Sequence, residues 1–540
     1  MSDAPRALVD AYERGLAPDD RRARGVHQTP AGLARALVDL ALDELWSSAG
    51  RLPSTVLDPS CGGGAFLLAA ADALVDRGMA PGQVVGGVLC GAELDPDGAA
   101  VARKALVQWA AGHGLPARSV RVPVLVGDAL VRPVEEWRTV VPHGADLVVG
   151  NPPFLSPLSA DVARPAALRA ALRARFDLVG RTVDAAALFL LLGAELLSDD
   201  GVAVLLQPRS VLAASDVGAV RARLSRDHAL VALWSDDADW FSAAVHVCAP
   251  VLRRGAQPAR VAVVSGAPAV AQYRAPAPDP ATWGPLLAPA YGVPGVTLAD
   301  GPALGSLASA TAGFRDEYYA LRDAVVDAAA GHGPPLATVG MVDPGALDWG
   351  VRPVRLGGAQ VRHPRVDLAA LGVAAPRVAA WVQARSVPKV LVAAQTKVVE
   401  AVADPVGDVV PLTPLISVEP HDPADLWRVA AVLLAPPVSA RAVADGLGTG
   451  RSATTLRWSA SSVLRTPLPP EPVAWAEGAS LAEQLHRGTP GTRPDLLARL
   501  ARAMVRAYGA DPDAPAGEDL VGWWLDRATV RGAGRAAVPV

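Results

Sequence analysis

The sequence has little cysteine and no long hydrophobic run. These two features argue against a disulfide-rich, a zinc-binding and a membrane-spanning protein. Its three cysteines, Cys61, Cys90 and Cys248, lie far apart without a Cys-x-x-Cys partner or a nearby histidine cluster, so neither a disulfide framework nor a zinc site is indicated. The most apolar stretch, residues 185–197, is too short to span a bilayer and contains Glu195. The opening of the chain has no uninterrupted apolar segment typical of a signal peptide. We therefore expect a cytoplasmic protein with no membrane partner and no metal.

Two catalytic signatures are also missing. A GxxxxGK[ST] loop, which would hold a triphosphate, does not occur, so nucleotide hydrolysis is not expected. No acidic-acidic-lysine cluster typical of a nuclease is recognisable, so a restriction activity would belong to a separate endonuclease or defence subunit. Lysine is nearly absent, and the formal net charge of −4 at pH 7 does not by itself indicate a nucleic-acid partner. A basic groove can nevertheless coexist with acidic outer faces.

The size and composition predict two folded domains. The chain has 540 residues, of which 51% are hydrophobic and 19% charged, as is typical of globular proteins with a large core. Proline, glycine and alanine concentrate around residues 255–300, where we place the junction. We expect a first domain over residues 1–260, a junction over 261–300, a second domain over 301–472 and a helical segment over 473–540.

The first half alternates short runs rich in valine and leucine with helical patterns. Strands are expected over residues 55–60, 84–94, 122–128, 145–150 and 201–208, and helices from Ala65, from Asp97, and over 184–198 and 214–225. This alternation predicts an α/β, Rossmann-like, mostly parallel sheet with helices on both faces. The second half is less regular, with strands expected over 388–395 and 408–420 and helices over 480–488 and 493–509, and predicts a mixed α+β domain.

Polar residues and glycines follow three successive strands, where ligands bind in parallel sheets. Gly62 and Gly64 form a turn after the first strand and allow close approach of a ligand to the backbone. Glu93 ends the second strand and can accept from both hydroxyls of a ribose, and Asp128 ends the third and can accept from an adenine amine. Taken singly, the glycines can be a tight connection and the acids helix N-caps or solvated loop residues. Together they indicate a cofactor that contains adenosine.

The fourth strand is followed by Asn151, Pro152, Pro153 and Phe154. The Asn151 side-chain oxygen and the Pro152 carbonyl can accept the two protons of an adenine amine and direct its lone pair at a methyl donor, without a general base. The prolines fix the backbone that holds these acceptors, and Phe154 offers a face on which a flipped purine can stack. The alternative is a rigid turn with Phe154 in the core.

These motifs, in the order DPSCGGGAFL, GAEL, VGD and VGNPPF, resemble the γ-type, TaqI-like, S-adenosylmethionine-dependent N6-adenine DNA methyltransferases. A Thr-Pro segment precedes the glycine motif in that family, and GVHQTPAGLARALVDLAL (25–42) is similar to it, although Thr29 and Pro30 also fit a plain N-cap and first helical position. The resemblance implies S-adenosylmethionine as cofactor, and it implies that the cofactor is held by Thr29, Asp58, Gly62, Gly64, Phe66, Glu93 and Asp128.

Later segments extend the resemblance. Residues 180–212 are similar to the helix, strand and P-x-S segment of the family, and 237–252 to the segment with an aromatic residue that packs on the flipped base, which implies Phe241, with Trp240 as its competitor. The second half is similar to a target-recognition region, where Lys397, Arg451 and Arg457 are candidate DNA contacts or, equally, solvated surface residues.

The resemblance implies methylation of a flipped adenine in double-stranded DNA, in a restriction-modification or phage-defence context. NPPF also occurs in methyltransferases that act on protein glutamine and on ribosomal RNA, so both substrates stay open. Cytosine N4 methylation and a catalytically silent DNA-binding subunit are further alternatives.

Overall fold

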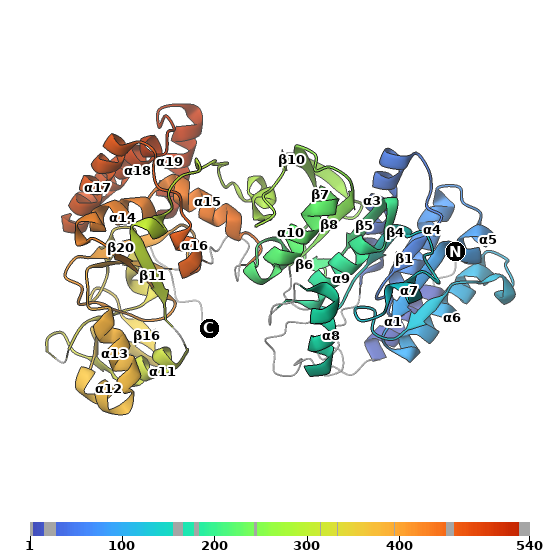
Figure 1. Cartoon of the computed structure of the whole chain (residues 1–540), viewed down its shortest axis with the longest axis horizontal. Coiled ribbons are helices and arrows are strands. Elements are labelled where there is room, and N and C mark those ends of the chain that lie inside the picture. Colours follow the sequence, from blue (N-terminus) through green and yellow to red (C-terminus); the bar gives the residue numbers. More distant parts are fainter. Residues whose placement is uncertain are drawn as a thin grey trace. The chain divides into compact units, whose positions relative to one another are not determined.

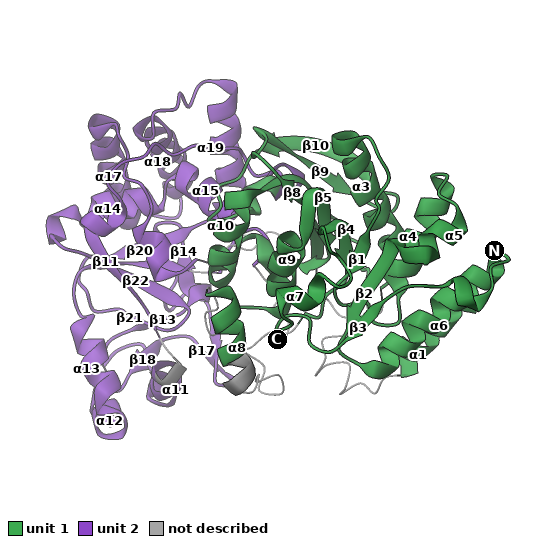
Figure 2. Ribbon diagram, turned by 45° about the vertical axis from the view of Figure 1, so that its right-hand side comes forward, with its two compact units in different colours: residues 1–286 green, residues 287–540 purple. Residues whose placement is uncertain are grey.

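The computed structural model divides into two compact units, residues 1–286 and 287–540 (Figure 2). The structure describes residues 4–15, 29–154, 166–177, 183–241, 246–313, 315–331, 333–393, 395–449 and 458–528. The boundary between the units lies inside residues 261–300, where the composition changes.

Unit 1 is built around a ten-stranded sheet with the strand order β10-β9-β7-β8-β5-β4-β1-β2-β3, and β6 pairs with β8 (Figure 1). The first five strands along the chain pair in parallel, whereas β8 runs antiparallel to both β5 and β7. The bounds are β1 Val56–Asp58, β2 Leu89–Glu93, β3 Val124–Val126, β4 Ala145–Gly150, β5 Leu197–Leu205, β6 Gln207–Pro208, β7 His228–Ser235, β8 Val247–Arg254, β9 Arg260–Ser265 and β10 Val270–Pro276.

The order of the strands reverses between β1 and β4. From β1 the chain moves outward through β2 and β3, and it then returns to place β4 on the other side of β1. Such a reversal opens a crevice beyond the carboxyl ends of the two central strands. The predicted α/β class with a mostly parallel sheet is therefore confirmed, and the glycine turn after β1 and the Asn-Pro-Pro-Phe corner after β4 flank the crevice.

Helices cover the sheet of unit 1. Helix α4 packs on α3 and on α6, and these three helices together cover β1 to β5. Helix α1 packs on α6, α9 packs on β5, α10 packs on β7, and α9 and α10 pack on each other. Helix α9 is apolar all round and buried from Ala185 to Ala194, as expected of a helix enclosed in a core. The bounds are α1 Ala4–Gly15, α3 Ala31–Ala49, α4 Ala65–Asp76, α5 Pro81–Gln83, α6 Pro96–Gly112, α7 Val134–Trp137, α8 Ala166–Phe176, α9 Ala185–Glu195 and α10 Gly218–Asp227.

Three expected elements differ from the structure. The strand expected over 84–94 begins only at Leu89, because residues 84–88 continue α5 as a helical turn that ends at Gly87 with φ of 145°. The helix expected over 214–225 begins at Gly218, after a short 3-10 turn. The proline-rich segment after residue 255 contains β9 and β10, which extend the sheet of unit 1.

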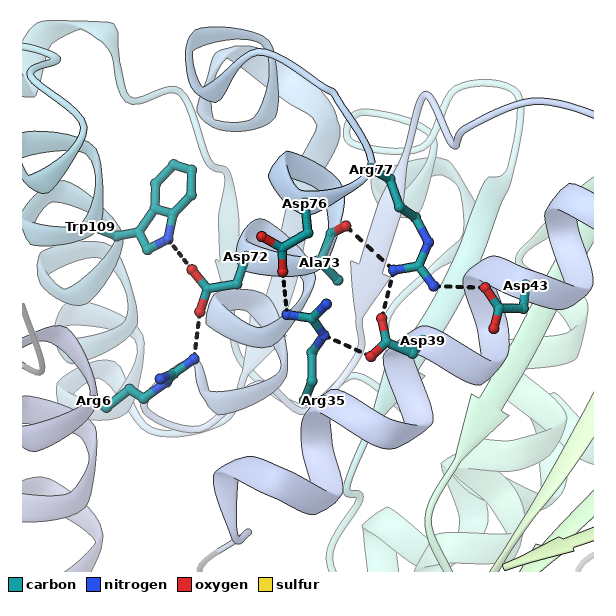
Figure 3. A network of polar contacts seen from close by, with 9 residues as sticks. All are labelled: Arg6, Arg35, Asp39, Asp43, Asp72, Ala73, Asp76, Arg77 and Trp109. Carbon is teal, nitrogen blue, oxygen red and sulfur yellow. Dashed lines mark hydrogen bonds and ion pairs between the residues drawn. The ribbon is translucent and has the colours of Figure 1, made fainter. Parts of the chain in front are cut away.

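A polar network fastens α1, α3, α4 and α6 together (Figure 3). The buried Asp72 on α4 accepts from Arg6 on α1 and, at 2.8 Å, from the indole nitrogen of Trp109 on α6. Arg35 on α3 donates to Asp76 on α4 at 2.8 Å. Exposed ion pairs contribute little each, but the buried carboxylate with two donors fixes the position of α1 against α4 and α6.

Unit 2 contains a four-stranded antiparallel sheet with the order β11-β22-β19-β20. Inside it, the buried Lys389 lies 2.6 Å from Asp404, which also accepts from two backbone amides. Helices of the carboxyl-terminal part pack on this sheet and on one another. The bounds are β11 Ala308–Ala312, β19 Lys389–Ala393, β20 Glu400–Asp404, β22 Leu415–Pro420, α14 Leu426–Leu433, α15 Pro436–Gly446, α16 Ala460–Leu464, α17 Pro472–Arg487, α18 Arg493–Ala507 and α19 Pro515–Ala528.

A second group of short elements in unit 2 has its own core. The bounds are α11 Arg315–Asp323, β12 Val325–Asp327, β13 Leu336–Ala337, β16 Val354–Leu356, β17 Ala359–Val361, β18 Pro364–Val366, α12 Leu368–Ala374, α13 Pro376–Ala384 and β21 Val410–Pro411. Two further short strands, β14 Val342–Asp343 and β15 Ala346–Leu347, pack on the core of the four-stranded sheet. The predicted mixed α+β character of the second half is confirmed. In the described part of the chain no single helix is long and apolar enough to cross a membrane; the bent pair 423–433 and 436–446 meets the length and composition criteria together.

Candidate active site

The glycine turn after β1 is shaped by two positive φ angles. Gly62 has φ of 51° and Gly64, directly before α4, has φ of 97°, conformations in which a side chain is strained. A Cβ on Gly64 would lie 3.2 Å from the Cα of Ala102, so this glycine lets the turn pack on α6. A Cβ on Gly62 would meet no described atom within 4 Å. Gly62 therefore borders open space, in which a ligand can approach the backbone.

The carboxylate of Glu93 is held against this turn by two backbone amides. One oxygen accepts from the amide of Gly62 at 2.8 Å, and the other from the amide of Asp95 at 2.8 Å. Burial raises the pKa of Glu93, whereas these two hydrogen bonds oppose the rise. Each oxygen has a second lone pair, so Glu93 can accept from two neighbouring hydroxyl groups without moving.

Helix α1 covers the same region, which the sequence did not indicate. The hydroxyl of Tyr12 donates to Asp95 at 2.9 Å. A Cβ on Gly98 would lie 2.9 Å from this hydroxyl and 3.2 Å from the Cγ of Glu93. Tyr12 and Glu93 therefore face the same glycine on α6. The amphipathic pattern of residues 4–15 was the available signal, but it does not reveal which surface the helix covers.

Glu13, the neighbour of Tyr12, has a buried carboxyl group and gives a pH-dependent prediction. Its side chain is 8% exposed, and one carboxyl oxygen has no hydrogen-bond partner among the described residues. Burial, together with the charge of Asp10, raises the pKa of Glu13 to about 8. Because this value lies above that of the unfolded chain, the folded protein binds more protons between about pH 4.5 and 8, and the stability falls as the pH rises through this window.

Replacing Glu13 by glutamine is expected to remove this dependence. The variant should be more stable than the wild type at pH 8, by roughly 2–4 kcal/mol if α1 unfolds with the rest of unit 1, and about equally stable at pH 4.5. Thermal unfolding followed at both pH values measures the difference. An equal shift at both pH values would contradict the buried, protonated carboxyl group.

Asp58 joins the glycine turn to the corner after β4. Its side chain is 1% exposed and accepts from the amide of Ser60 at 3.0 Å. Burial, with a smaller contribution from the charge of Glu93, raises the pKa of Asp58 to about 8. A Cβ on Gly150 would lie 2.5 Å from the Oδ1 of Asp58, so the carboxyl group packs on the backbone of the residue that precedes Asn151.

Thr29 and Asn151 are in contact although they are 122 residues apart in the sequence. The amide nitrogen of Asn151 donates to the hydroxyl of Thr29 at 3.0 Å. The N-cap interpretation of Thr29 is wrong, because α3 begins at Ala31, the cap position is Pro30 and no side chain caps the helix. The hydroxyl instead engages the nitrogen of Asn151, which fixes the orientation of the amide group and directs its oxygen to the opposite side.

We expect Thr29→Val to slow the proposed reaction by about fivefold, because it removes one hydrogen bond of about 1 kcal/mol that orients Asn151 and leaves the side-chain volume nearly unchanged. Thr29→Ser keeps the hydroxyl and is the matched control. Single-turnover rates at saturating cofactor measure the effect. Equal rates for the two variants would show that the contact does not orient Asn151.

The other corner residues lie close to the core. Pro152 is buried, Pro153 and Phe154 are half-buried, and Phe154 packs against the core of unit 1. Phe241 is 9% exposed and belongs to the same core, and Trp240 is partly buried beside it. Residues 242–245 and 155–165, which adjoin these aromatic residues, are outside the described part.

The strand ends of β2 and β3 add two apolar residues that the sequence interpretation missed. Leu94 is 63% exposed directly after Glu93, and Val126 is 43% exposed at the end of β3, where it pairs with Glu93. Asp128 follows and is half-buried, and its carboxylate accepts from the amide of Leu130 at 2.9 Å. Exposed apolar side chains next to two carboxylates suit a flat, partly polar ring such as adenine.

Of the remaining predicted contacts, one is buried, one is exposed in unit 2 and two lie outside the described residues. The ring of Phe66, in the first turn of α4, is buried in the core at 2% exposure. Lys397 is exposed in unit 2, between β19 and β20. Arg451 and Arg457 lie outside the described residues. Within the described ranges, no group of three or more histidine, cysteine, aspartate or glutamate residues is arranged to hold a metal ion.

The strand order, with the glycine turn after β1 and the acidic end of β2, is that of the class I methyltransferase fold, a Rossmann-like and mostly parallel sheet. Residues 4–265 match the family model described as N-6 DNA Methylase. The matched residues contain the whole sheet up to β9, with the glycine turn and the corner after β4. No curated protein matches the chain in sequence.

Solved structures of similar fold extend over both units. The Type IIL restriction-modification enzyme MmeI in complex with DNA aligns with a TM-score of 0.60 at 14% identity, over 98% of this chain and 82% of the other. A nuclease-deletion mutant of the Type ISP enzyme LlaGI with a DNA substrate mimic gives 0.54 at 10%, over 90% and 56%. The DrdV–DNA complex gives 0.51 at 13%, over 90% and 60%. The chain thus spans less than two thirds of the LlaGI and DrdV chains.

Proposed function

We propose that this protein is a DNA methyltransferase that transfers a methyl group from S-adenosylmethionine to N6 of an adenine, as part of a restriction-modification system. The observation that carries the proposal is the contact of the two halves of the crevice: Asp58, at the glycine turn, packs on Gly150, and Asn151 follows in the next position. A donor bound along the turn and an amine held by the corner would therefore be neighbours.

The residues around the glycine turn fit the proposed cofactor. Gly62 borders open space, Glu93 is fixed with spare acceptor capacity, and Leu94 and Val126 expose apolar surface. Glu93 would accept from the ribose hydroxyls, and Asp128 would face the adenine amine. When bound, the cofactor supplies an electrophilic methyl group on a sulfonium sulfur.

The corner after β4 supplies two acceptors for the target. The side-chain oxygen of Asn151 and the carbonyl of Pro152 would accept the two protons of the amine, which concentrates the nitrogen lone pair on the side of the donor. Pro152 and Pro153 restrict the backbone, so the acceptors are positioned before the target arrives. No side chain needs to remove a proton before the methyl group moves.

An adenine reaches this corner only when it leaves the helix. Unstacking costs a few kcal/mol, and stacking on an aromatic ring returns about 1–3 kcal/mol per base. Phe154, which is half-buried beside Asn151, supplies one face, and Phe241 or Trp240 would supply the other. Stacking within the corner can therefore offset the free-energy cost of flipping the base out of the helix.

The restriction-modification context rests on the structural relatives. MmeI is described as a restriction-modification enzyme solved with DNA, and its similarity covers both units of this chain. Unit 2 would then recognise double-stranded DNA, and a restriction endonuclease would be its partner in the system. The large second unit disfavours a protein-glutamine methyltransferase, and the fixed Glu93 and Asn151 disfavour a catalytically silent subunit.

Transfer of a labelled methyl group distinguishes the substrates. Purified protein is incubated with S-adenosyl[methyl-³H]methionine and, separately, with double-stranded DNA, structured RNA and glutamine-containing peptides. The proposal predicts label in DNA alone. Label in RNA or peptide, with none in DNA, would contradict it.

A further inference from the structure

The hairpin formed by β16 and β17 in unit 2 is a tight two-stranded ribbon. Its strands are joined by Gly357 and Gly358, with φ of 56° and 90°, so the turn carries no side chain. Across the ribbon, Arg355 pairs directly with Gln360. At the tip, Gly358 borders open space, whereas a Cβ on Gly357 would lie 3.1 Å from the Cδ of Arg322 on α11.

The two faces of this ribbon differ in character. Leu356 and Val361 are each 8% exposed and belong to the second core, and Val354 packs against that core. Side chains alternate between the faces of a strand, so the opposite face carries Arg355 and Gln360, and both are exposed. The apolar face thus anchors the ribbon and presents this polar pair to solvent.

The segment around the ribbon concentrates positive charge. Residues 349–366 contain four arginines and one histidine and no aspartate or glutamate, in a chain whose formal net charge is −4. Arg352 bridges two aspartates, Arg365 donates to backbone carbonyls, and Arg362 lies near the carboxylate of Asp327. Among the described residues, Arg355 has no ion pair and no side-chain hydrogen bond.

We infer that this ribbon reads bases in the major groove of double-stranded DNA, with Arg355 directed at a guanine and Gln360 at an adenine; the inference rests on the proposed function. A two-stranded ribbon fits the groove, which is about 12 Å wide. Arginine donates two hydrogen bonds to O6 and N7 of guanine, and glutamine pairs with N6 and N7 of adenine.

The spacing of the pair matches neighbouring base pairs. Residues directly opposite on antiparallel strands have Cβ atoms about 5 Å apart, and base pairs rise by about 3.4 Å. Two extended side chains from these positions reach adjacent steps of the groove. The ribbon would therefore specify a guanine and an adenine that are next to each other in the recognised sequence.

The uncharged member of the pair distinguishes base reading from phosphate binding. A surface that only neutralises phosphates needs cations and gains little from a glutamine at its centre. Gln360 has the donor and acceptor of an amide in one plane, which is the pattern that an adenine edge requires. Arg352 and Arg362, at the base of the ribbon, lie near aspartate carboxylates instead, so the exposed face of the ribbon presents Arg355 and Gln360.

Selection of duplexes from a random pool tests the inference without requiring catalysis. The full chain is mixed with random double-stranded DNA, bound molecules are sequenced, and the wild type is compared with Arg355→Ala and Gln360→Ala. Arg355→Ala should lose the preference for guanine at one position by roughly 10- to 100-fold, and Gln360→Ala the preference for adenine at the adjacent position by a similar factor. The remaining positions should keep their preferences.

Arg499→Ala is the matched control, since Arg499 is an exposed arginine of the same unit, on α18. It should leave every preference unchanged. Unchanged preferences in both ribbon variants, or a uniform loss of binding across all sequences, would overturn the inference. Methyl transfer is measured in parallel: selection of a sequence without methylation would contradict the proposed function alone, and methylation with unaltered selection would contradict the ribbon alone.

Discussion

Replacing Asn151 by alanine is expected to lower the rate of methyl transfer by about 10²- to 10³-fold, which is the loss that follows removal of one preorganised group at a reacting centre. The alanine removes the oxygen proposed to accept an amine proton, so the nitrogen lone pair stays delocalised in the ring. Cofactor affinity should change by no more than a few-fold, because Glu93 and Gly62 hold each other independently of the corner.

Single-turnover rates and calorimetric cofactor affinities, measured on the same preparations, test this expectation. Thr29→Val is the internal comparison, because it removes the hydrogen bond between Thr29 and Asn151 but retains the amide oxygen. A smaller effect of Thr29→Val than of Asn151→Ala would distinguish the orientation of the amide group from its acceptance of the amine proton. Near-normal turnover of Asn151→Ala would refute the mechanism of the corner.

Glu93→Ala is expected to weaken cofactor binding by about 10- to 100-fold, because two backbone amides lose a charged acceptor and unsatisfied buried donors cost about 1–3 kcal/mol each. The amides belong to Gly62 and Asp95, so the glycine turn and the start of α6 both lose their shared anchor. The carboxylate proposed to accept from the ribose is lost at the same time.

The matched variant is Glu93→Gln, which keeps one oxygen as an acceptor and removes the charge. Titration calorimetry should place its affinity between those of the wild type and Glu93→Ala. Thermal unfolding of the free proteins separates damage to the turn from loss of a ligand contact. An affinity unchanged in Glu93→Ala would remove this residue from the cofactor site.

The part of the site that follows single strands could be predicted from sequence. Gly62, Glu93 and Asn151 lie at or shortly after the carboxyl ends of strands with strong patterns, and parallel strands bring these ends to one edge of the sheet. The fold class followed from the same alternation. The fold class and the residues at strand ends follow from the hydrophobic periodicity and the order of the elements, and both can be predicted from a single sequence.

Contacts between distant segments could not be predicted in the same way. The hydrogen bond of Thr29 to Asn151 joins residues 122 positions apart, and locally Thr29-Pro30 fits an N-cap equally well. Tyr12 reaches Asp95 only because α1 packs on α6. Such pairings depend on how helices pack, which periodicity alone does not specify.

Local composition gave a wrong prediction where a valine-rich segment fits either a strand or a helical turn. Residues 84–88 are rich in valine and were expected to extend a strand, yet the helix started by Pro81 continues through them until Gly87. The ribbon formed by β16 and β17 could not be predicted, because each strand has only three residues and is too short to show a hydrophobic alternation.

The proposed role of the corner after β4 is to hold an adenine of DNA for methylation. Methylation-aware sequencing of DNA from cells that express the wild type or Asn151→Ala tests this role. We expect N6-methyladenine at one fixed position of a defined sequence with the wild type, and none with the variant. Unmodified DNA with the active wild type, modification of cytosine instead, or the same adenine methylation with Asn151→Ala would contradict it.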